Sequence, residues 1–285
     1  MAWGTICIVW GTTYVAIKIA LQTIPPFLMG GIRYIAAGLI LGAFAVNRGY
    51  RLPPVGQWGT LALLGFLMLL MGNGGVAWGS QYVPSGLVAV LVGMSPFWMT
   101  GVDALMRDGK QLFLRQWIGL VIGLAGITTL VWPDITAGGA SGRNFALGVL
   151  SVQIACAGWA VGSAYTRRHV MPGHILGAAS VQMAAGGVFM ALAGMLAGEW
   201  RHLSFTPATT AAVGYLILFG SVIAFAAYSY ALQHLDIAIV SLYTYINPVI
   251  AVALGTILLG EPFHARMAIA AGIIVAGILI VGKAK

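Results

Sequence analysis

Apolar runs of about 20 residues recur along the whole chain, and they limit what it can fold into. Such a run is long enough to cross the hydrocarbon core of a bilayer as a helix. The chain is 60% hydrophobic and 7% charged, whereas soluble domains carry about 25% charged residues. The sequence therefore predicts an all-α integral membrane protein. Its ten transmembrane helices are expected at residues 2–21, 27–46, 57–79, 83–106, 114–133, 144–166, 175–198, 208–232, 238–260 and 265–282.

The longest polar linker, residues 134–143, divides these runs into two sets of five. The halves echo each other, because Cys7-x-x-Trp10 matches Cys156-x-x-Trp159 and Gly-spaced apolar segments recur in the same order. Since five is odd, the second half enters the membrane from the opposite side, as in inverted-topology repeats. We expect a first five-helix repeat at 1–133, a periplasmic linker at 134–143 and an inverted second repeat at 144–285, together forming one transmembrane domain.

Positive charge is unevenly distributed between the connections on the two sides of the membrane. One side collects Arg48, Arg51, Arg107, Lys110, Arg115, Arg167, Arg168, Lys283 and Lys285. Lys and Arg are enriched in cytoplasmic connections, so this side is predicted to be cytoplasmic, with both termini. The net charge of +8 is too sparse to indicate a nucleic-acid partner.

One stretch occurs twice, as QYVPSGLVAVLVGMSP ending at Pro96 and as QHLDIAIVSLYTYINP ending at Pro248. Each proline falls near the middle of a predicted span, where it removes a backbone hydrogen bond and kinks the helix. Interrupted segments at matched positions of two halves point to a transporter's midplane site. A harmless kink is the alternative, since proline is common in membrane helices. We predict hinges at Pro96 and Pro248.

Aromatic and polar side chains at membrane depth are the candidate substrate-binding residues. They are Asn73, Trp78, Tyr82, Ser95, Trp98, Trp159, Tyr243 and Asn247. The alternatives are an interfacial aromatic belt and hydrogen bonds between helices, which membrane proteins use routinely. Trp98 and Trp159 lie too deep for a belt, and Ser95 and Asn247 each directly precede a kinking proline. We expect these residues to face one shared aqueous space.

Charge within the spans is scarce, and the sequence carries no pattern of an enzyme or a metal site. Arg33 lies inside the second span and is a functional hypothesis by default. Asp103 is expected to pair with Arg107 four residues later, and Glu261 to lie at an interface. No catalytic residue, metal ligand or cofactor is predicted. Gly38-x3-Gly42, Gly119-x3-Gly123 and similar pairs indicate close helix packing, or a dimer face.

Several of these segments resemble the drug/metabolite transporter superfamily, in particular its EamA-type branch. The resemblance rests on Trp10 to Lys18, on Ile32-Arg33-Tyr34 and on Asn247-Pro248 followed by Leu259-Gly260-Glu261-Pro262, and it covers essentially the whole chain. It implies a bacterial inner-membrane carrier with a central cavity between the halves. Within that branch the chain is similar to an amino-acid exporter.

The sequence thus leads to a functional hypothesis, with alternatives left open. We expect an exporter of small metabolites, above all amino acids including aromatic ones, that works by alternating access without a coupling ion. Proton relays use Asp, Glu or His within the membrane, and none is seen at midspan. A carrier of sugar phosphates, nucleotide sugars or drugs is the alternative, as is a passive channel. The expected partners are a small-molecule substrate and the lipid bilayer, and the protein is a monomer or a homodimer.

Overall fold

A computed structural model describes residues 2–105, 114–137, 140–168, 175–234, 243–261 and 264–282. Within these ranges every element of regular structure is helical. Six helical stretches are long and apolar enough to cross a membrane by length and composition, and shorter apolar helices accompany them. The predicted class of an all-α membrane protein is confirmed.

The first half begins with two uninterrupted helices, α1 (Ala2–Ala20) and α2 (Pro26–Asn47). The third and fourth predicted spans are each composite. The third consists of a 3₁₀ turn η1 (Val55–Gln57), α3 (Trp58–Leu64), a π-helical segment η2 (Gly65–Gly74) and α4 (Gly75–Gly79). The fourth is divided into α5 (Ser85–Val92) and α6 (Ser95–Leu105), and α7 (Leu114–Ala137) closes the half.

The second half follows the same plan. It contains α8 (Ala140–Arg168), α9 (Ile175–Leu196), a 3₁₀ turn η3 (Glu199–His202), α10 (Pro207–Tyr215), a π-helical segment η4 (Leu216–Ile223), α11 (Ala224–His234), α13 (Tyr243–Leu259) and α14 (Ala265–Gly282). The π-helical segments η2 and η4 thus occupy the same place in the third and eighth spans.

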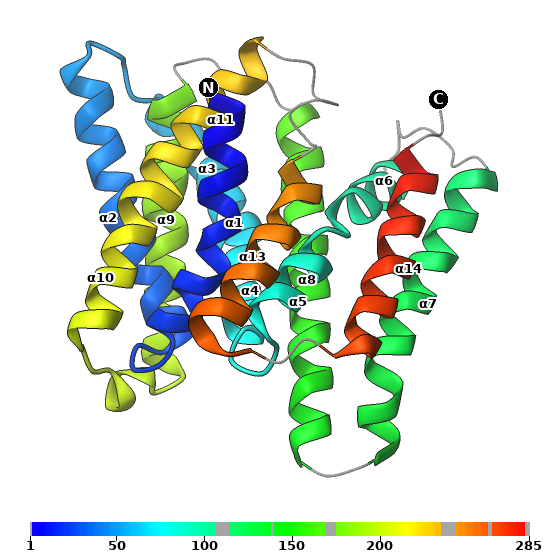
Figure 1. The fold of residues 1–285 in the computed structure, drawn as a ribbon. Helices are drawn as coiled ribbons and strands as arrows, with labels where there is room; N and C mark the ends of the chain where they lie inside the picture. Colours follow the sequence, from blue (N-terminus) through cyan, green and yellow to red (C-terminus); the bar gives the residue numbers. More distant parts are fainter. Residues whose placement is uncertain are drawn as a thin grey trace.

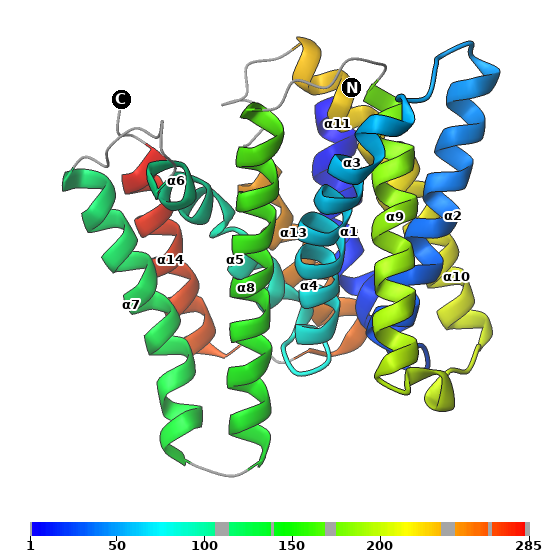
Figure 2. The ribbon, with the colours of Figure 1, turned by 180° about the vertical axis from the view of Figure 1, so that it is seen from behind.

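Packing between the halves shows the same correspondence. Helix α2 packs against its counterpart α9, and α7 packs against α14. Helix α1 packs against α13 of the other half, as α8 packs against α6. Helices α1 and α8 run in opposite directions through the bundle (Figures 1 and 2). The repeat is therefore inverted, as the odd number of spans in each half predicts.

The N-terminus, the end of α2 and the end of α14 lie at one end of the bundle, which we call the terminal end (Figure 1). The turn from α1 to α2 and the start of α8 lie at the opposite end, the far end. This arrangement fits the predicted topology. Which end faces the cytoplasm stays a prediction.

Reporter fusions test this orientation. A reporter fused after Lys285, and one inserted in residues 48–54, should both report the cytoplasm, because the positive connections gather at that end. A reporter within residues 134–143 should report the periplasm. A cytoplasmic signal from that linker would contradict the orientation, and a truncated chain with the reporter fused after Asn47 would serve as an independent check.

The connection between α7 and α8 is shorter than the linker predicted at residues 134–143. Helix α7 continues to Ala137 and α8 starts at Ala140, so most of residues 134–143 is helical. A helix satisfies its own backbone hydrogen bonds in water as well as in lipid, so it need not end where the apolar run ends. The division into repeats at these residues stays a prediction.

Closely spaced glycines bring helix backbones together. A β-carbon at Gly38 of α2 would lie 2.7 Å from the backbone nitrogen of Ala184 in α9. A β-carbon at Gly277 of α14 would lie 2.7 Å from the carbonyl oxygen of Gly119 in α7. These glycines serve packing within the bundle. Gly198 instead adopts a left-handed conformation with φ of 74°, which favours glycine, at the turn after α9.

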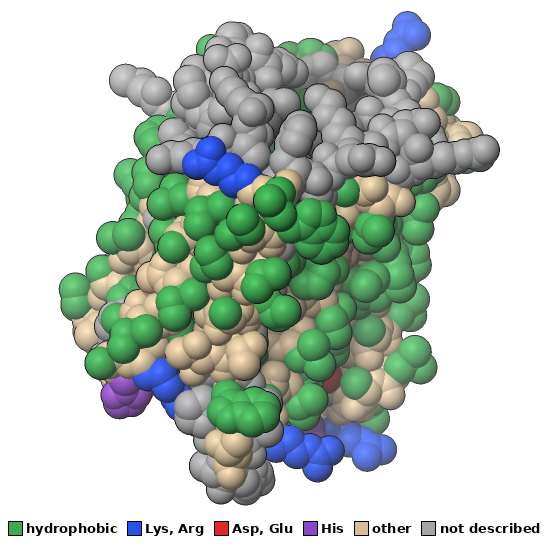
Figure 3. All heavy atoms as spheres, turned by 90° about the vertical axis from the view of Figure 1, so that its right-hand side faces the viewer, with side chains coloured by type: hydrophobic (Ala, Val, Ile, Leu, Met, Phe, Trp, Pro, Cys, Tyr) green, Lys and Arg blue, Asp and Glu red, His purple; other side chains and the backbone are tan. Residues whose placement is uncertain are grey.

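The face formed by α7 and α14 is largely apolar, and the Lys and Arg side chains visible on it lie toward the two ends of the bundle (Figure 3). Large side chains such as Val121, Leu124, Ile269 and Val275 are exposed there. An apolar band between charged ends is what a surrounding bilayer requires.

Candidate transport site

Near Pro96 the fourth span is broken rather than kinked. Helix α5 ends at Val92 and α6 begins at Ser95. A broken helix frees backbone carbonyls, which must find partners where no water is present. The Ser95 hydroxyl donates to the carbonyl of Val92 at 2.6 Å, and it also lies 3.7 Å from the sulfur of Cys156 in α8.

Near Pro248 the ninth span stays helical, since this proline lies inside α13. Asn247 is 3% exposed. The Asn247 amide is oriented with its nitrogen toward two backbone carbonyls. This nitrogen donates to the carbonyl of Cys7 at 3.0 Å and to that of Tyr243 at 3.1 Å. The side chain before the second proline therefore ties α13 to α1.

The two prolines are thus embedded in matched surroundings. Ser95 contacts Cys156, and Asn247 bonds to Cys7, so each pre-proline residue reaches the matching cysteine position in the other half. The repeat places these contacts across the interface between the halves. The role of Pro96 and Pro248 as hinges stays a prediction.

An aromatic cluster lies where α1, α11 and α13 meet. The ring centroid of Trp10 is 5.2 Å from that of Tyr228 and 4.9 Å from that of Tyr243. Tyr228 and Tyr243 are 6.2 Å apart, edge to face. Such edge-on contacts stabilise aromatic clusters beyond the apolar area they bury. Of these residues, only Tyr243 was among the predicted binding residues.

A buried cation lies next to this cluster. Arg33 of α2 is 5% exposed. Its Nε donates to the hydroxyl of Ser221 at 2.8 Å and its Nη2 donates to the carbonyl of Gly220 at 3.3 Å. Its guanidinium also stacks 4.7 Å from the ring centroid of Tyr34. None of these described partners carries a negative charge.

The carbonyl of Gly220 links the cation to the aromatic cluster. It accepts from Nε1 of Trp10 at 3.3 Å as well as from Arg33. Gly220 belongs to η4, where the π-helical turn alters the backbone hydrogen bonding. π-Helical turns inside α-helices often occur at functional sites. A β-carbon at Gly220 would lie 3.2 Å from Nη2 of Arg33, so glycine keeps this approach open.

Trp98 of α6 and Trp159 of α8 have other neighbours. Nε1 of Trp98 donates to Oε1 of Gln153 at 2.9 Å. Nε2 of Gln153 is buried and has no hydrogen-bond partner among the described residues. A β-carbon at Gly72 would come 3.3 Å from the ring of Trp159, and the amide of the adjacent Asn73 donates to the carbonyl of Met68 at 3.2 Å.

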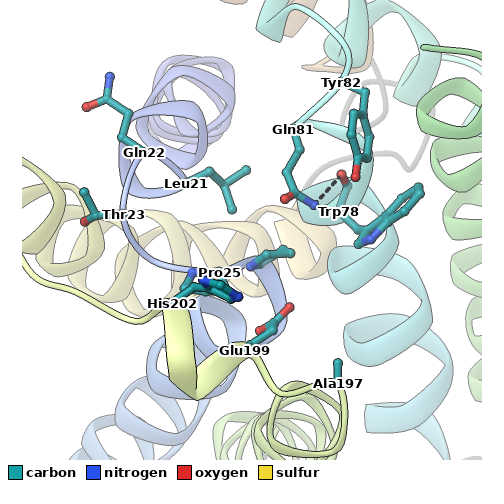
Figure 4. A pocket seen from close by; sticks show the side chains of 11 residues that line it. Leu21, Gln22, Thr23, Pro25, Trp78, Gln81, Tyr82, Ala197, Glu199 and His202 are labelled. Carbon is teal, nitrogen blue, oxygen red and sulfur yellow. Dashed lines mark hydrogen bonds between the residues drawn. The ribbon is translucent and has the colours of Figure 1, made fainter. Parts of the chain in front are cut away.

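Trp78 and Tyr82 lie in a third place, at the far end. They line a cavity of about 360 Å³ together with the turn after α1 and the end of α9 (Figure 4). The structure therefore brings Tyr243 and Asn247 together beside α1, and Ser95 and Trp98 together beside α8. That all eight predicted residues face one shared space stays a prediction. Their role in transport stays a prediction.

Sequence reasoning missed Trp10, Tyr228, Gly220 and Gln153 as members of a site. Gln153 could have been found, because a polar residue within an apolar run is itself an indication of a functional site. No sequence feature indicated Gly220, because its importance depends on the π-helical turn. The predicted pairing of Asp103 with Arg107 lies outside the described residues, since Arg107 is not described.

Lys18 and Glu261 have structural partners at the far end. Nζ of Lys18 donates to the carbonyls of Ser80 at 2.6 Å and Val83 at 3.1 Å. Oε2 of Glu261 accepts from the backbone nitrogen and the hydroxyl of Ser85, both at 2.7 Å, and so caps the start of α5. The described residues include no cluster of three or more side chains that would suit a metal ion.

Comparison with known proteins places this architecture in a family. The EamA-like transporter family matches residues 4–132 and again residues 146–283, so each half matches once. The chain belongs to the EamA-like transporter family. It is therefore a transmembrane transporter, and the ten-helix double repeat is the plan of that family.

Individual relatives agree with this assignment. The chain is 39% identical over 281 residues to the "Uncharacterized inner membrane transporter YedA" of Escherichia coli (strain K12), covering 98% of this chain and 88% of the relative. It is 26% identical over 274 residues to the "Uncharacterized transporter YvbV" of Bacillus subtilis (strain 168), covering 96% and 88%.

A solved protein crystal structure shares the fold. It superposes with a TM-score of 0.65 at 21% identity and covers 98% of this chain and 95% of its own. At this identity the likeness concerns the fold alone. The comparisons do not confirm the narrower resemblance of this chain to the amino-acid exporter YddG, which stays a prediction.

Proposed function

We propose that this transporter exports small zwitterionic metabolites, above all amino acids including aromatic ones, across a bacterial inner membrane. The observation that carries the proposal is Arg33, a buried cation beside the aromatic cluster of Trp10, Tyr228 and Tyr243. A guanidinium is suited to a planar carboxylate, which it binds through two parallel hydrogen bonds. Aromatic faces next to it suit an apolar or aromatic side chain.

Charge supports this assignment. A cation within the membrane is costly, and such residues are commonly retained for a ligand or a counter-ion. The partners of Arg33 among the described residues, Ser221 and Gly220, are neutral. They account for two of the five N–H groups of the guanidinium. A substrate carboxylate would supply the missing negative charge.

The mechanism proposed is alternating access by rocking of the two halves about the regions of Pro96 and Pro248. Ser95 and Asn247, which precede these prolines, form the contacts between the halves described above. Tilting one half against the other would change those contacts. Transporters with inverted repeats commonly work by such rocking around a fixed site.

Transport is proposed to be facilitated, without a coupling ion. Proton coupling needs an ionisable carboxylate or imidazole at membrane depth. The two described acidic residues with assigned partners, Glu199 and Glu261, lie at the far end and bind backbone N–H groups there. A zwitterion carries no net charge, so the membrane potential should hardly affect its flux.

A carrier of sugar phosphates is the second candidate, because arginine binds phosphate as well as carboxylate. A dianionic phosphate calls for more than one cation. The ammonium group of Lys18 in α1 already donates to two backbone carbonyls at the far end. This favours a substrate with a single negative group.

Flux measurements with purified protein in proteoliposomes test the proposal. We expect saturable uptake of a labelled aromatic amino acid that is accelerated by unlabelled amino acid on the other side. Sugar phosphates and organic cations should not compete. A pH gradient imposed without a substrate gradient should cause no accumulation.

Liposomes without protein provide the background. Competition by sugar phosphates with no effect of amino acids would favour the second candidate. Flux that does not saturate and shows no countertransport would indicate a passive channel. Uphill accumulation that collapses with a protonophore would show that the transport is proton-coupled.

A further inference from the structure

The far end of the bundle contains a cavity whose lining does not include Arg33 or the Trp10 cluster. Its volume is about 360 Å³, within the range of sites for small molecules. Three separate segments line it: the turn from α1 to α2, the turn from α4 to α5, and the end of α9 with η3. Figure 4 shows Trp78 and Tyr82 on one side and Leu21 and Thr23 on the other, with Glu199 between them.

The cavity has a negative character. Glu199 is the only residue among those lining it that is formally charged at neutral pH with histidine uncharged. The nearby cation Arg201 lies 5.2 Å from the ring centroid of Trp200, which does not line the cavity. The ammonium group of Lys18 is directed to Ser80 and Val83. A cationic ligand would therefore be attracted to this space.

The Glu199 carboxylate is held in a fixed position. Its Oε2 accepts from the backbone nitrogen of Leu28 at 2.8 Å, and its Oε1 accepts from that of Phe27 at 3.3 Å. A carboxylate can accept about four hydrogen bonds, so each oxygen keeps room for a further donor. The group is thus placed in advance for a ligand, which loses little freedom when it binds.

Aromatic rings form the other wall. The ring centroids of Trp78 and Tyr82 lie 5.0 Å apart at an interplanar angle of 63°. The adjacent Gln81 donates to the carbonyl of Trp78 at 3.1 Å, which fixes the turn that carries both rings. Aromatic faces attract organic cations, and Trp is the strongest of them. A carboxylate and aromatic faces together suit an ammonium group attached to an apolar body.

We propose that this cavity is a binding site for small organic ammonium ions at the far end, separate from the site at Arg33. The two sites have opposite charge preferences, because a buried guanidinium repels the ligand that Glu199 attracts. The proposal does not depend on which substrate crosses the membrane. It concerns binding at one end of the bundle.

Calorimetric titration of the purified protein tests the proposal with three related probes. Phenethylammonium carries the cation, phenylethanol is a neutral analogue, and phenylacetate carries the opposite charge. We expect phenethylammonium to bind at least about tenfold more tightly than the other two, in line with the strength of cation–π and charge-assisted contacts. Trp78→Leu and Glu199→Gln should each weaken its binding about tenfold or more.

Trp200→Leu is the matched control, because Trp200 neighbours Glu199 but lies outside the cavity and is exposed. It should leave the affinity unchanged. Glu199→Gln also weakens the cap on α2, so its thermal unfolding is measured alongside. Tyr82→Leu, which leaves that cap intact, provides a second variant of the cavity.

Two results would overturn the proposal: equal affinity for phenethylammonium and phenylethanol, or unchanged affinity in both Trp78→Leu and Tyr82→Leu. Arg33→Gln separates this site from the transport site. It should bind phenethylammonium as the unmodified protein does, even though its amino-acid flux is expected to fall about 100-fold. If the protein does not transport amino acids, the expected binding of phenethylammonium at the far end is still the same.

Discussion

Replacing Arg33 by glutamine should reduce amino-acid flux at low substrate concentration about 100-fold. Removing one member of a buried, hydrogen-bonded charge pair typically costs about 2–5 kcal/mol, and ~3 kcal/mol corresponds to this factor. Glutamine can still donate to Ser221 or Gly220 but offers no charge to a substrate carboxylate. The measurement is initial uptake of a labelled amino acid into proteoliposomes.

The fold should survive this substitution. A buried charge without a counter-ion is costly to the folded state, and a neutral glutamine in its place avoids that cost. Thermal unfolding and gel filtration of the purified variant check this. Arg201→Gln is the control, since Arg201 lies exposed over Trp200 at the far end and should transport normally.

Arg33→Lys distinguishes charge from shape. Lysine keeps the charge but lacks the planar fork that binds a carboxylate through two hydrogen bonds, so intermediate flux is expected. If Arg33→Gln is folded and transports with unchanged KM and maximal rate, Arg33 does not bind the substrate. The cation would then serve only the packing of α2 against η4.

The spans could be predicted from the sequence because hydrocarbon thickness fixes their length. The expected helix at 2–21 is found at Ala2–Ala20, and the one at 27–46 is found at Pro26–Asn47. The π-helical segments could not be predicted. Both Gly65–Gly74 and Leu216–Ile223 are apolar throughout most of their length, and a wider helical turn leaves no distinct hydrophobic period.

Pro96 and Pro248 both predict a kink near the middle of a span, but the helices around them differ in the structure. The span is broken before Pro96, whereas Pro248 lies within a continuous helix. Gly93 precedes the first proline by three residues, and glycine weakens a helix by about 1 kcal/mol relative to alanine. Tyr245 occupies the corresponding place before Pro248, so the second helix lacks that weakness.

The candidate site was only partly predictable. Depth along a span can be read from the sequence, but the sequence does not show whether Asn247 faces a cavity or bonds to neighbouring helices; in the structure it is 3% exposed and bonds to backbone carbonyls. The direction of a side chain cannot be read in helices that are apolar on every face. Trp98 and Tyr243 therefore have similar depth signals but different neighbours, Gln153 and the Trp10 cluster.

Replacing Gly277 by leucine should strongly destabilise the protein. A β-carbon there would lie 2.7 Å from the carbonyl oxygen of Gly119 and 2.7 Å from the backbone nitrogen of Gly123. Both atoms belong to the backbone of α7 and cannot move aside as a side chain could. Overpacking of this kind costs about 1–3 kcal/mol, and more where backbones must separate. Thermal unfolding of the purified protein measures the effect.

Gly272→Leu is the matched control within the same helix. A β-carbon at Gly272 would have no atom within 4 Å, and the residue is exposed on α14. A leucine facing lipid is favourable, and a glycine removed from a helix interior adds up to about 1 kcal/mol of helix propensity. Gly272→Leu should therefore unfold at the same temperature as the unmodified protein or higher.

Equal stability of Gly277→Leu and Gly272→Leu would show that α7 and α14 do not pack through Gly119, Gly123 and Gly277. If too little Gly277→Leu can be purified, Gly277→Ala takes its place in the measurement. It should also lower the unfolding temperature, but by less.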